Sequence, residues 1–277
     1  MNNKFYVVAT PIGNLDDISL RALDVLKNVD FIFCENPLYS QKLLNYFKIE
    51  KKPLYSLHKY KEIKIKEFVE EKLKKGNCAL ITDSGTPTIS DPGQFIINYL
   101  KLKEVDVIPI PGPNAIITAL SGSGIIFNSF VFIGFLDRRR AKIIGKIEDL
   151  KYLVDVIIFY ESPKRIINTL KIILEFYQKD LEIIIARELT KKFEEIKKLT
   201  INTFLKRENL KGEFVVLLPT KNFLNLEIEL DKIKKNLDFL RNLDLKDQEI
   251  LMIYNLFDNK VKKNQLYNLL KEKKEIK

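Results

Sequence analysis

Glycine and proline gather in three short loops whose composition suits the binding of a nucleotide-like ligand. The loops read Thr-Pro-Ile-Gly-Asn at residues 10–14, Thr-Asp-Ser-Gly-Thr-Pro at 82–87 and Pro-Gly-Pro-Asn at 111–114. Glycine lets backbone N–H and C=O groups approach a ligand closely, and proline fixes a loop without needing a partner for an N–H donor. Each loop alone also fits a tight turn between a strand and a helix. Their recurrence favours loops that hold an adenosine and an amino-acid tail.

Several common chemistries are missing from the sequence. The chain has one histidine, His58, which excludes histidine-rich metal sites and any histidine-based triad that does not use it. Gly122 and Gly124 lack the third glycine of a dinucleotide-binding fingerprint, and there is no P-loop. We therefore predict no metal site and expect a nucleotide-like ligand to be held in another way.

Strand and helix patterns alternate over the first part of the chain. Short apolar runs predict strands at residues 5–9, 31–34, 79–82 and 105–110, and apolar residues at helical spacing lie between them. Such alternation implies a parallel α/β sheet. Because ligand crevices in these sheets lie at the carboxyl ends of the strands, the three loops should meet at one edge.

A second alternating set follows, and then the strands stop. It comprises predicted strands at 130–135, 156–160, 183–186 and 214–218, with helices at 138–150 and 163–177. The proline-rich turn at 111–113 marks the boundary between the sets, and charged helical patterns begin near residue 225. We predict an α/β domain at 1–112, a second at 113–224 and a helical tail at 225–277.

Charge and cysteine usage limit the partners and the compartment. The formal net charge of the 277 residues is +10, which suits contact with a phosphate backbone, although an AT-rich codon bias would also produce a lysine excess. Cys34 and Cys78 sit in apolar runs, so no disulfide framework is expected. The N-terminus shows no signal sequence and no apolar segment reaches membrane-spanning length, so we predict a cytoplasmic protein without membrane contact.

Longer strings around these loops resemble a known family. They are YVVATPIGNLDDISLRAL from Tyr6, TDSGTPTISDPG from Thr82 and PGPNAIITALSGSG from Pro111, followed by FYESPKR from Phe159, ARELTK from Ala186 and GEF from Gly212. Together they resemble the ribosomal RNA branch of the tetrapyrrole methylases, across roughly residues 4–220. The resemblance implies the two-domain tetrapyrrole methylase-like α/β fold, a class III methyltransferase fold, here with a small C-terminal helical appendage. It further implies S-adenosylmethionine in the cleft, a homodimer, and 2′-O-methylation of a cytidine in the decoding region of 16S rRNA within the small ribosomal subunit.

The resemblance also assigns binding residues. The residues that it places around the cofactor are Pro11, Ser84, Gly85, Thr86, Pro87, Ile89, Asn114, Ala115 and Tyr160, with Glu161 beside them. Those that it places against the RNA are Asn14, Arg138, Arg139, Arg140, Lys164 and Arg165. A solvated helix start is the alternative interpretation of the three consecutive arginines.

Methyl transfer to a ribose hydroxyl requires alignment of the reactants and loss of a proton. The candidate helpers at or just after predicted strand ends are Glu35, Glu161, Arg187, Glu188 and Lys191, and the sequence does not rank them. For Arg187 and Glu188, an ion pair that steadies the domain interface is favoured over direct catalysis. For His58, a satisfied polar residue is favoured over a base.

One departure from the family leaves two other functions open. The family follows its second strand with Glu-Asp-Thr-Arg, whereas this chain has Glu35, Asn36, Pro37 and Leu38. The chain is thus also consistent with a ribosome-assembly factor that binds the cofactor but has lost turnover. A methylase of a corrin or porphyrin ring is the other alternative.

Overall fold

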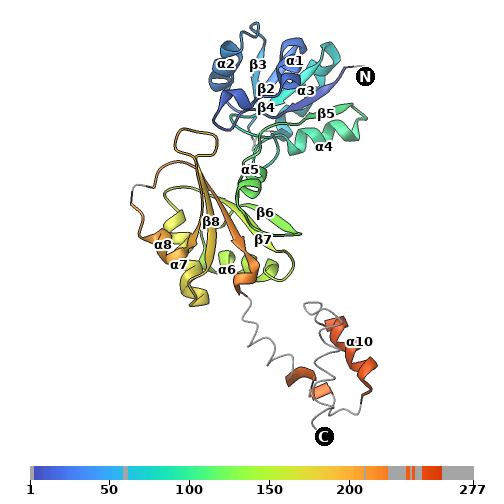
Figure 1. Cartoon of the computed structure of the whole chain (residues 1–277). Helices are drawn as coiled ribbons and strands as arrows, with labels where there is room; N and C mark the ends of the chain where they lie inside the picture. Colours follow the sequence, from blue (N-terminus) through green and yellow to red (C-terminus); the bar gives the residue numbers. More distant parts are fainter. Residues whose placement is uncertain are drawn as a thin grey trace.

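Two five-stranded sheets form the framework of the protein (Figure 1). The computed structural model describes residues 3–58, 62–208, 210–223, 235–237, 239–240 and 245–257. The tail predicted at 225–277 lies largely outside the described residues, and its main described element is α10 (Asp247–Phe257). Helix α5 (Ala115–Gly122) lies between the two sheets in Figure 1.

The first sheet is entirely parallel, as the alternating pattern predicts. Its strands are β1 (Phe5–Val8), β2 (Phe31–Cys34), β3 (Leu54–Ser56), β4 (Cys78–Ile81) and β5 (Val107–Ile110), in the order β3-β2-β4-β1-β5. Because β1 lies near the centre, between β4 and β5, the loops that follow these three strands are neighbours at one edge. These are the three glycine and proline loops.

Helices cover both faces of the first sheet. On one face α3 (Glu62–Lys75) and α4 (Gln94–Leu102) bury Leu73 and Leu100 against Phe5 and Phe33. On the other face lie α1 (Leu20–Asn28) and α2 (Pro37–Tyr46), next to the short 3-10 helix η1 (Leu15–Asp17). Cys34 and Cys78 are buried free thiols, as expected.

The second sheet is mixed rather than parallel. Its strands are β6 (Phe130–Phe135), β7 (Val156–Glu161), β8 (Glu182–Arg187), β9 (Glu195–Thr200) and β10 (Phe214–Pro219), in the order β6-β7-β10-β8-β9. Only β6 and β7 run parallel, whereas β10 is antiparallel to both β7 and β8. This register brings Phe214 opposite both Glu161 and Arg187, so three distant segments end side by side.

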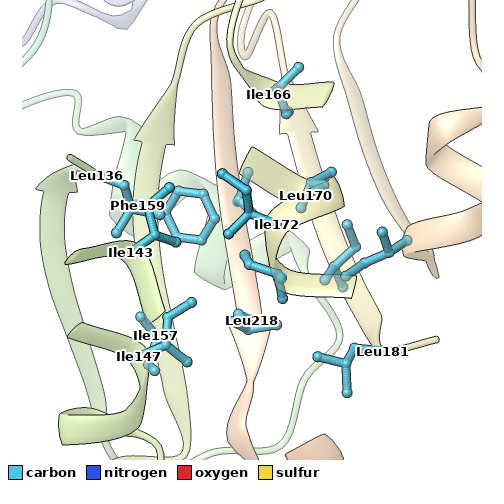
Figure 2. Close-up of a cluster of buried hydrophobic side chains, with 14 of the residues drawn as sticks. Leu136, Ile143, Ile147, Ile157, Phe159, Ile166, Leu170, Ile172, Leu181 and Leu218 are labelled. Carbon is cyan, nitrogen blue, oxygen red and sulfur yellow. The ribbon is translucent and has the colours of Figure 1, made fainter. Parts of the chain in front are cut away.

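The largest core cluster packs on one face of this second sheet. Helices α6 (Arg140–Leu150), α7 (Ile166–Tyr177) and α8 (Ile201–Leu205) cover that face. Figure 2 shows the fully buried Phe159 among Ile143, Leu136 and Ile172. The opposite face carries α5 together with Ile12 and Ile89 from the loops of the first sheet. That face is therefore where the two sheets approach each other.

Several elements depart from the sequence-based expectation. Strands β3 and β9 and helices α4 and α8 were not predicted, and two helices begin later than predicted, since α6 starts at Arg140 and α7 at Ile166. Strand β3 has three residues and β9 carries lysines at an exposed edge, so neither forms an apolar run. The break between β5 and α5 supports the division near residue 112, which remains a proposal.

We expect truncation of Phe159 to destabilise the second sheet strongly. Phe159→Ala removes a fully buried ring from the core in Figure 2, which should lower the free energy of unfolding by about 3–5 kcal/mol. Leu153→Ala is the control, because Leu153 is 72% exposed, and it should change that free energy by less than about 0.5 kcal/mol. Urea unfolding followed by circular dichroism measures both; equal midpoints for the two variants would contradict this account of the core.

Candidate active site

A cavity of about 310 Å³ lies where the loops of the first sheet meet the second sheet. Its size is at the lower end of the range for small-molecule sites. The loops of the first sheet contribute Ile12, Ser84, Gly85, Thr86, Ile89, Ser90 and Asp91, and the start of α5 contributes Asn114 and Ala115. The second contributes Phe135, Tyr160, Glu161, Ser162, Pro163, Leu189, Lys191, Glu213, Phe214 and Val215. The cavity has one wall from each sheet.

The loop after β4 forms a fixed part of the wall. Thr10 and Gly85 exchange both backbone hydrogen bonds, at 2.9 and 3.0 Å, which ties this loop to the one after β1. Gly85 has φ +82°, and Thr88 and Ser90 also have positive φ values of 76° and 72°. Residues with side chains adopt this conformation only when their surroundings hold them there. The loop is thus held in a single strained shape around the cavity.

The amino end of α5 forms another part of the wall. The Asn114 side chain caps this helix by accepting hydrogen bonds from the N–H groups of Ile116 and Ile117. The Thr86 hydroxyl donates to the Pro113 carbonyl at 3.0 Å, and the Asn114 amide lies 3.4 Å from that hydroxyl. These bonds join the loops after β4 and β5.

Aromatic rings form the apolar part of the wall. The Tyr160 ring lies 4.8 Å from the Phe132 ring and 5.6 Å from the Phe135 ring, centroid to centroid. Burial, with the negative charges of Asp91 and Glu213, raises the pKa of Tyr160 to about 12. The phenol therefore stays protonated at neutral pH and is a hydrogen-bond donor rather than a base.

Lys191 provides the positive charge of the cavity wall. Its ammonium lies 3.0 Å from Glu188 Oε1 and 3.3 Å from Glu213 Oε2. Burial lowers the pKa of Lys191, but the bonds and charges of these two carboxylates outweigh burial and leave the pKa above its ordinary value. Lys191 is therefore a fixed cation and not a proton acceptor.

The two walls touch directly at Gly13. A Cβ atom there would lie 2.5 Å from Lys191 Cγ, 2.7 Å from Thr190 Oγ1 and 2.9 Å from the Leu189 carbonyl oxygen. The neighbouring Asn14 N–H donates to Thr190 Oγ1 at 2.9 Å. Glycine is required at this point because the loop after β1 packs against the backbone of the loop between β8 and β9.

Glu161 lines the cavity, but its carboxylate is fully engaged in the protein. One oxygen accepts from the Ser162 N–H at 2.9 Å and lies 3.3 Å from Arg165 Nε, and the other accepts from the Thr169 hydroxyl at 2.8 Å. The side chain is 0% exposed. A buried carboxylate with this set of donors joins β7 to α7 and is held in place as part of the scaffold.

Most of the predicted cofactor residues come together at the cavity. Those that line it are Ser84, Gly85, Thr86, Ile89, Asn114, Ala115 and Tyr160. Pro11 and Pro87 are buried next to lining residues but do not line it themselves. Their role as direct contacts to a cofactor is not supported by this geometry.

The predicted catalytic residues separate into two groups. Glu161 and Lys191 line the cavity, whereas Glu35 and Arg187 do not. The Arg187 guanidinium donates to the Lys211 carbonyl at 2.7 Å and lies over the Phe214 ring, so it supports the wall from behind. Burial and the charge of Asp83 raise the pKa of Glu35, which lies outside the cavity at the end of β2.

None of the residues predicted to contact RNA lines the cavity. Asn14 caps η1 by accepting from the Asp16 N–H. Arg139 and Arg140 form ion pairs with Asp137 and Glu175, and Arg165 binds Glu161 and the Leu136 carbonyl. Arg138 and Lys164 are exposed. Lys164 directly follows Pro163, which lines the cavity.

The altered stretch after β2 forms an ordinary helix start. The Asn36 side chain accepts hydrogen bonds from the N–H groups of Leu38 and Tyr39, and Pro37 occupies the first turn of α2. His58, which sequence analysis left open, contacts Ser56 through Nε2 at 2.9 Å. Neither Asn36 nor His58 lines the cavity.

Sequence reasoning gave no role to several residues of the cavity wall. They are Ile12, Ser90, Asp91, Phe135, Ser162, Pro163, Leu189, Glu213, Phe214 and Val215. Asp91 and Glu213 stood inside the strings that carry the family resemblance, so a signal existed for them. Phe135 and Val215 reach the cavity through strand register, which local patterns do not reveal.

Among the residues that the structure describes, no group of three or more histidine, cysteine or acidic side chains is arranged to hold a metal ion. No helix in the described ranges is long and apolar enough to cross a membrane.

Residues 4–205 match the family of tetrapyrrole (corrin/porphyrin) methylases. A protein of Mesomycoplasma conjunctivae named ribosomal RNA small subunit methyltransferase I is 42% identical over 238 residues, covering 85% of this chain and 96% of that protein. The protein of the same name from Buchnera aphidicola subsp. Schizaphis graminum is 40% identical over 277 residues, covering 97% of this chain and 96% of its own length.

Solved structures with the same fold have little sequence identity. A crystal structure of diphthine synthase gives a TM-score of 0.62 at 14% identity and covers 78% of this chain and 90% of its own. Uroporphyrin III C-methyltransferase from Thermus thermophilus gives 0.56 at 13% identity and covers 80% of this chain and all of its own. At this level of identity the likeness concerns the fold.

Neutralising Glu161 should affect stability, because its carboxylate is buried among its donors. Glu161→Gln keeps the shape but removes the charge opposite Arg165 and reverses one hydrogen bond to Thr169, so the free energy of unfolding should fall by about 1–3 kcal/mol. Thr169→Val removes one donor and should give a smaller loss. Urea unfolding measures both, and an unchanged midpoint for Glu161→Gln would contradict the assignment of this carboxylate to the scaffold.

Proposed function

Because the chain belongs to the tetrapyrrole (corrin/porphyrin) methylase family and, within it, to the ribosomal RNA small subunit methyltransferase I group, we propose that it methylates small-subunit ribosomal RNA with S-adenosylmethionine. The family predicted from the sequence and its fold class are thus confirmed. We further propose that the acceptor is a cytidine 2′-hydroxyl in the decoding region of 16S rRNA. The proposed location is the cytoplasm, where that substrate is made.

The charges of the cavity suit this cofactor. S-adenosylmethionine carries a sulfonium, an ammonium and a carboxylate, and therefore one net positive charge. The ionisable wall residues are three carboxylates, Asp91, Glu161 and Glu213, and one ammonium, Lys191. Arg165 neutralises Glu161 from outside the wall, which leaves a net negative cavity. This match between cavity and cofactor charge is the observation that carries the proposal.

The shape and polarity of the walls also fit the cofactor. Ile12, Ile89 and Leu189, with the rings of Tyr160 and Phe135, supply apolar surface for an adenine. The amino end of α5 at Asn114 and Ala115 is positive because of the aligned peptide dipoles, so it favours the cofactor carboxylate. Gly85 allows close approach of the backbone after β4.

The bound cofactor supplies a methyl group already activated on its sulfonium. The residues of the chain supply the other requirements of methyl transfer. Two walls fixed by the Thr10–Gly85 and Gly13–Thr190 contacts hold the reactants in line, which is the main requirement of a displacement reaction. The Lys191 ammonium places a fixed positive charge where negative charge develops on an attacking oxygen.

The structure favours the enzyme over an assembly factor without turnover. That alternative arose from Asn36, Pro37 and Leu38, which here cap and begin α2. They lie outside the cavity and replace no residue of its wall. The departure from the family pattern therefore leaves the proposed cofactor site complete.

The proposed function is tested by binding and transfer with matched glycine variants. The protein should bind S-adenosylmethionine in calorimetry and transfer labelled methyl to one cytidine of unmodified small ribosomal subunits. Gly85→Ala strains the cavity loop at φ +82°, and movement of that loop should weaken cofactor binding about tenfold.

Gly124→Ala is the control for this experiment. Gly124 has φ +67°, nothing lies within 4 Å of its added Cβ, and it does not line the cavity. The two variants thus carry the same kind of backbone strain. Equal loss of affinity in both would overturn the site assignment, and cofactor binding without transfer to any rRNA would overturn the proposed substrate.

We also propose a homodimer formed through the β6 side of the second sheet. Strand β6 is an edge strand with the sequence FVFIGF, and its residues are half-buried or exposed. Nearby in the chain, Ile117 on α5 is 55% exposed and Ile126 is 95% exposed. An apolar edge strand with exposed apolar neighbours is a surface that proteins usually cover.

A charge on this surface should separate the subunits. Ile126→Asp places a carboxylate in the proposed apolar contact, so sedimentation velocity should show a monomer for the variant and a dimer for the wild type. Leu153→Asp is the control, because Leu153 is 72% exposed but belongs to the connection between α6 and β7. A dimer that persists in Ile126→Asp but is lost in Leu153→Asp would place the interface elsewhere.

A further inference from the structure

The transfer of a methyl group to a hydroxyl oxygen leaves a proton that a basic group must accept. The oxygen acids of the cavity wall are Asp91, Tyr160, Glu161 and Glu213. Tyr160 is excluded as a base at neutral pH because its phenol is protonated. Glu161 is excluded because its side chain is 0% exposed and its charge is paired with Arg165. Two carboxylates, Asp91 on one wall and Glu213 on the other, remain.

Glu213 combines a fixed backbone with an exposed head group. Its N–H donates to Glu188 Oε1 at 3.2 Å, and its carbonyl accepts from the Glu188 N–H at 3.2 Å. The preceding Gly212 has φ +92°, and a Cβ atom there would lie 2.4 Å from Glu188 Oε1. The carboxylate itself is different, because the Glu213 side chain is 80% exposed. A base that acts on a large RNA has to be exposed at the open side of the cavity, and the Glu213 carboxylate meets this requirement.

The neighbour of Glu213 also suits proton transfer. Its Oε2 lies 3.3 Å from Lys191 Nζ, and Lys191 is held in turn by Glu188. A hydroxyl placed against Glu213 would therefore lie beside an ammonium that stabilises negative charge on its oxygen. Asp91, the other candidate, is half-buried, so it is less accessible to a large substrate than Glu213.

We propose that Glu213 accepts the proton of the substrate hydroxyl, with Lys191 beside it as the positioning cation. This inference rests on the proposed function. In the step, the hydroxyl oxygen forms a bond to the methyl carbon while the bond from that carbon to sulfur breaks. The electron pair of the broken bond stays on sulfur, which leaves as a neutral thioether, and the hydroxyl proton moves to the Glu213 carboxylate. Atoms and charge balance without any further reactant.

The ionisable groups around Glu213 come from the loop between β8 and β9 and from the end of β7. Lys191 and Glu188 belong to the loop between β8 and β9, and Tyr160 lies at the end of β7, where it feels the charges of both Glu213 and Asp91. Only Lys191 among these carries a positive charge. Loss of Glu213 would thus leave the Lys191 ammonium with space and charge for a small anion.

The experiment uses this vacancy for chemical rescue. Glu213→Ala should lower the single-turnover rate on small ribosomal subunits, measured at saturating cofactor, about 100-fold or more. Sodium formate, which restores a carboxylate beside Lys191, should raise the rate of this variant at least about tenfold. Asp91→Ala and Lys191→Met should show no such gain.

A second readout needs neither cofactor nor RNA. Formate should raise the thermal midpoint of Glu213→Ala, and it should not do so when Lys191→Met is added, because the anion then lacks its partner. Chloride at equal ionic strength is the control for salt.

The outcomes separate the two proposals. Wild-type protein that transfers no methyl group to any rRNA overturns the proposed function and this inference with it. Wild-type transfer together with formate rescue of Asp91→Ala, or with near-normal rates in Glu213→Ala, overturns the role of Glu213 alone. Glu213→Ala that is slow and is not rescued, although formate binds it, assigns the residue to the support of Lys191 and also overturns its role as acceptor.

Discussion

The cavity depends on one close contact, the packing of Gly13 against the loop between β8 and β9. Here loops of the two sheets meet, and a Cβ atom at Gly13 would overlap Lys191 Cγ, Thr190 Oγ1 and the Leu189 carbonyl oxygen. The contact joins the two walls beside Lys191, whose ammonium belongs to the cavity lining. Residues 188 and 190 have positive φ values of 49° and 64°, so the second loop is held in a strained shape to make this contact.

The same chemical group has different roles on this wall because its surroundings differ. Glu161 is buried among a guanidinium, a hydroxyl and an N–H, and it stabilises the join between β7 and α7. Glu213 directly precedes Phe214, the first residue of β10, which pairs with Glu161; its own head group reaches solvent. Burial with a full set of donors makes a carboxylate structural, whereas exposure beside one cation leaves it available for chemistry.

Local sequence was sufficient for four of the five strands of the first sheet and for the loops of the proposed cofactor site. Ser84, Gly85 and Asn114 follow apolar runs directly, so both their turn chemistry and their place at a strand end are visible in a few residues. The second sheet was less predictable. Strand β10 enters antiparallel between β7 and β8, and no local pattern states that order. Phe135 and Glu213 therefore reach the cavity through long-range register. Glu35 follows its strand as predicted, but it lies near Asp83 and outside the cavity.

The fold and the choice of substrate depend on different parts of the molecule. Diphthine synthase and uroporphyrin III C-methyltransferase share the fold at 13–14% identity, so the two-sheet frame does not select an acceptor. The choice of methyl acceptor must therefore depend on side chains that face outward from the cavity. Of the basic residues predicted there, Arg139, Arg140 and Arg165 are engaged by carboxylates of the protein itself. Arg165 in particular cannot leave Glu161 without exposing a buried charge. The exposed Arg138 and Lys164 can meet a phosphate without breaking an ion pair that the protein needs, so the proposed RNA surface has its basis in these two residues and in the exposed rim at Glu213.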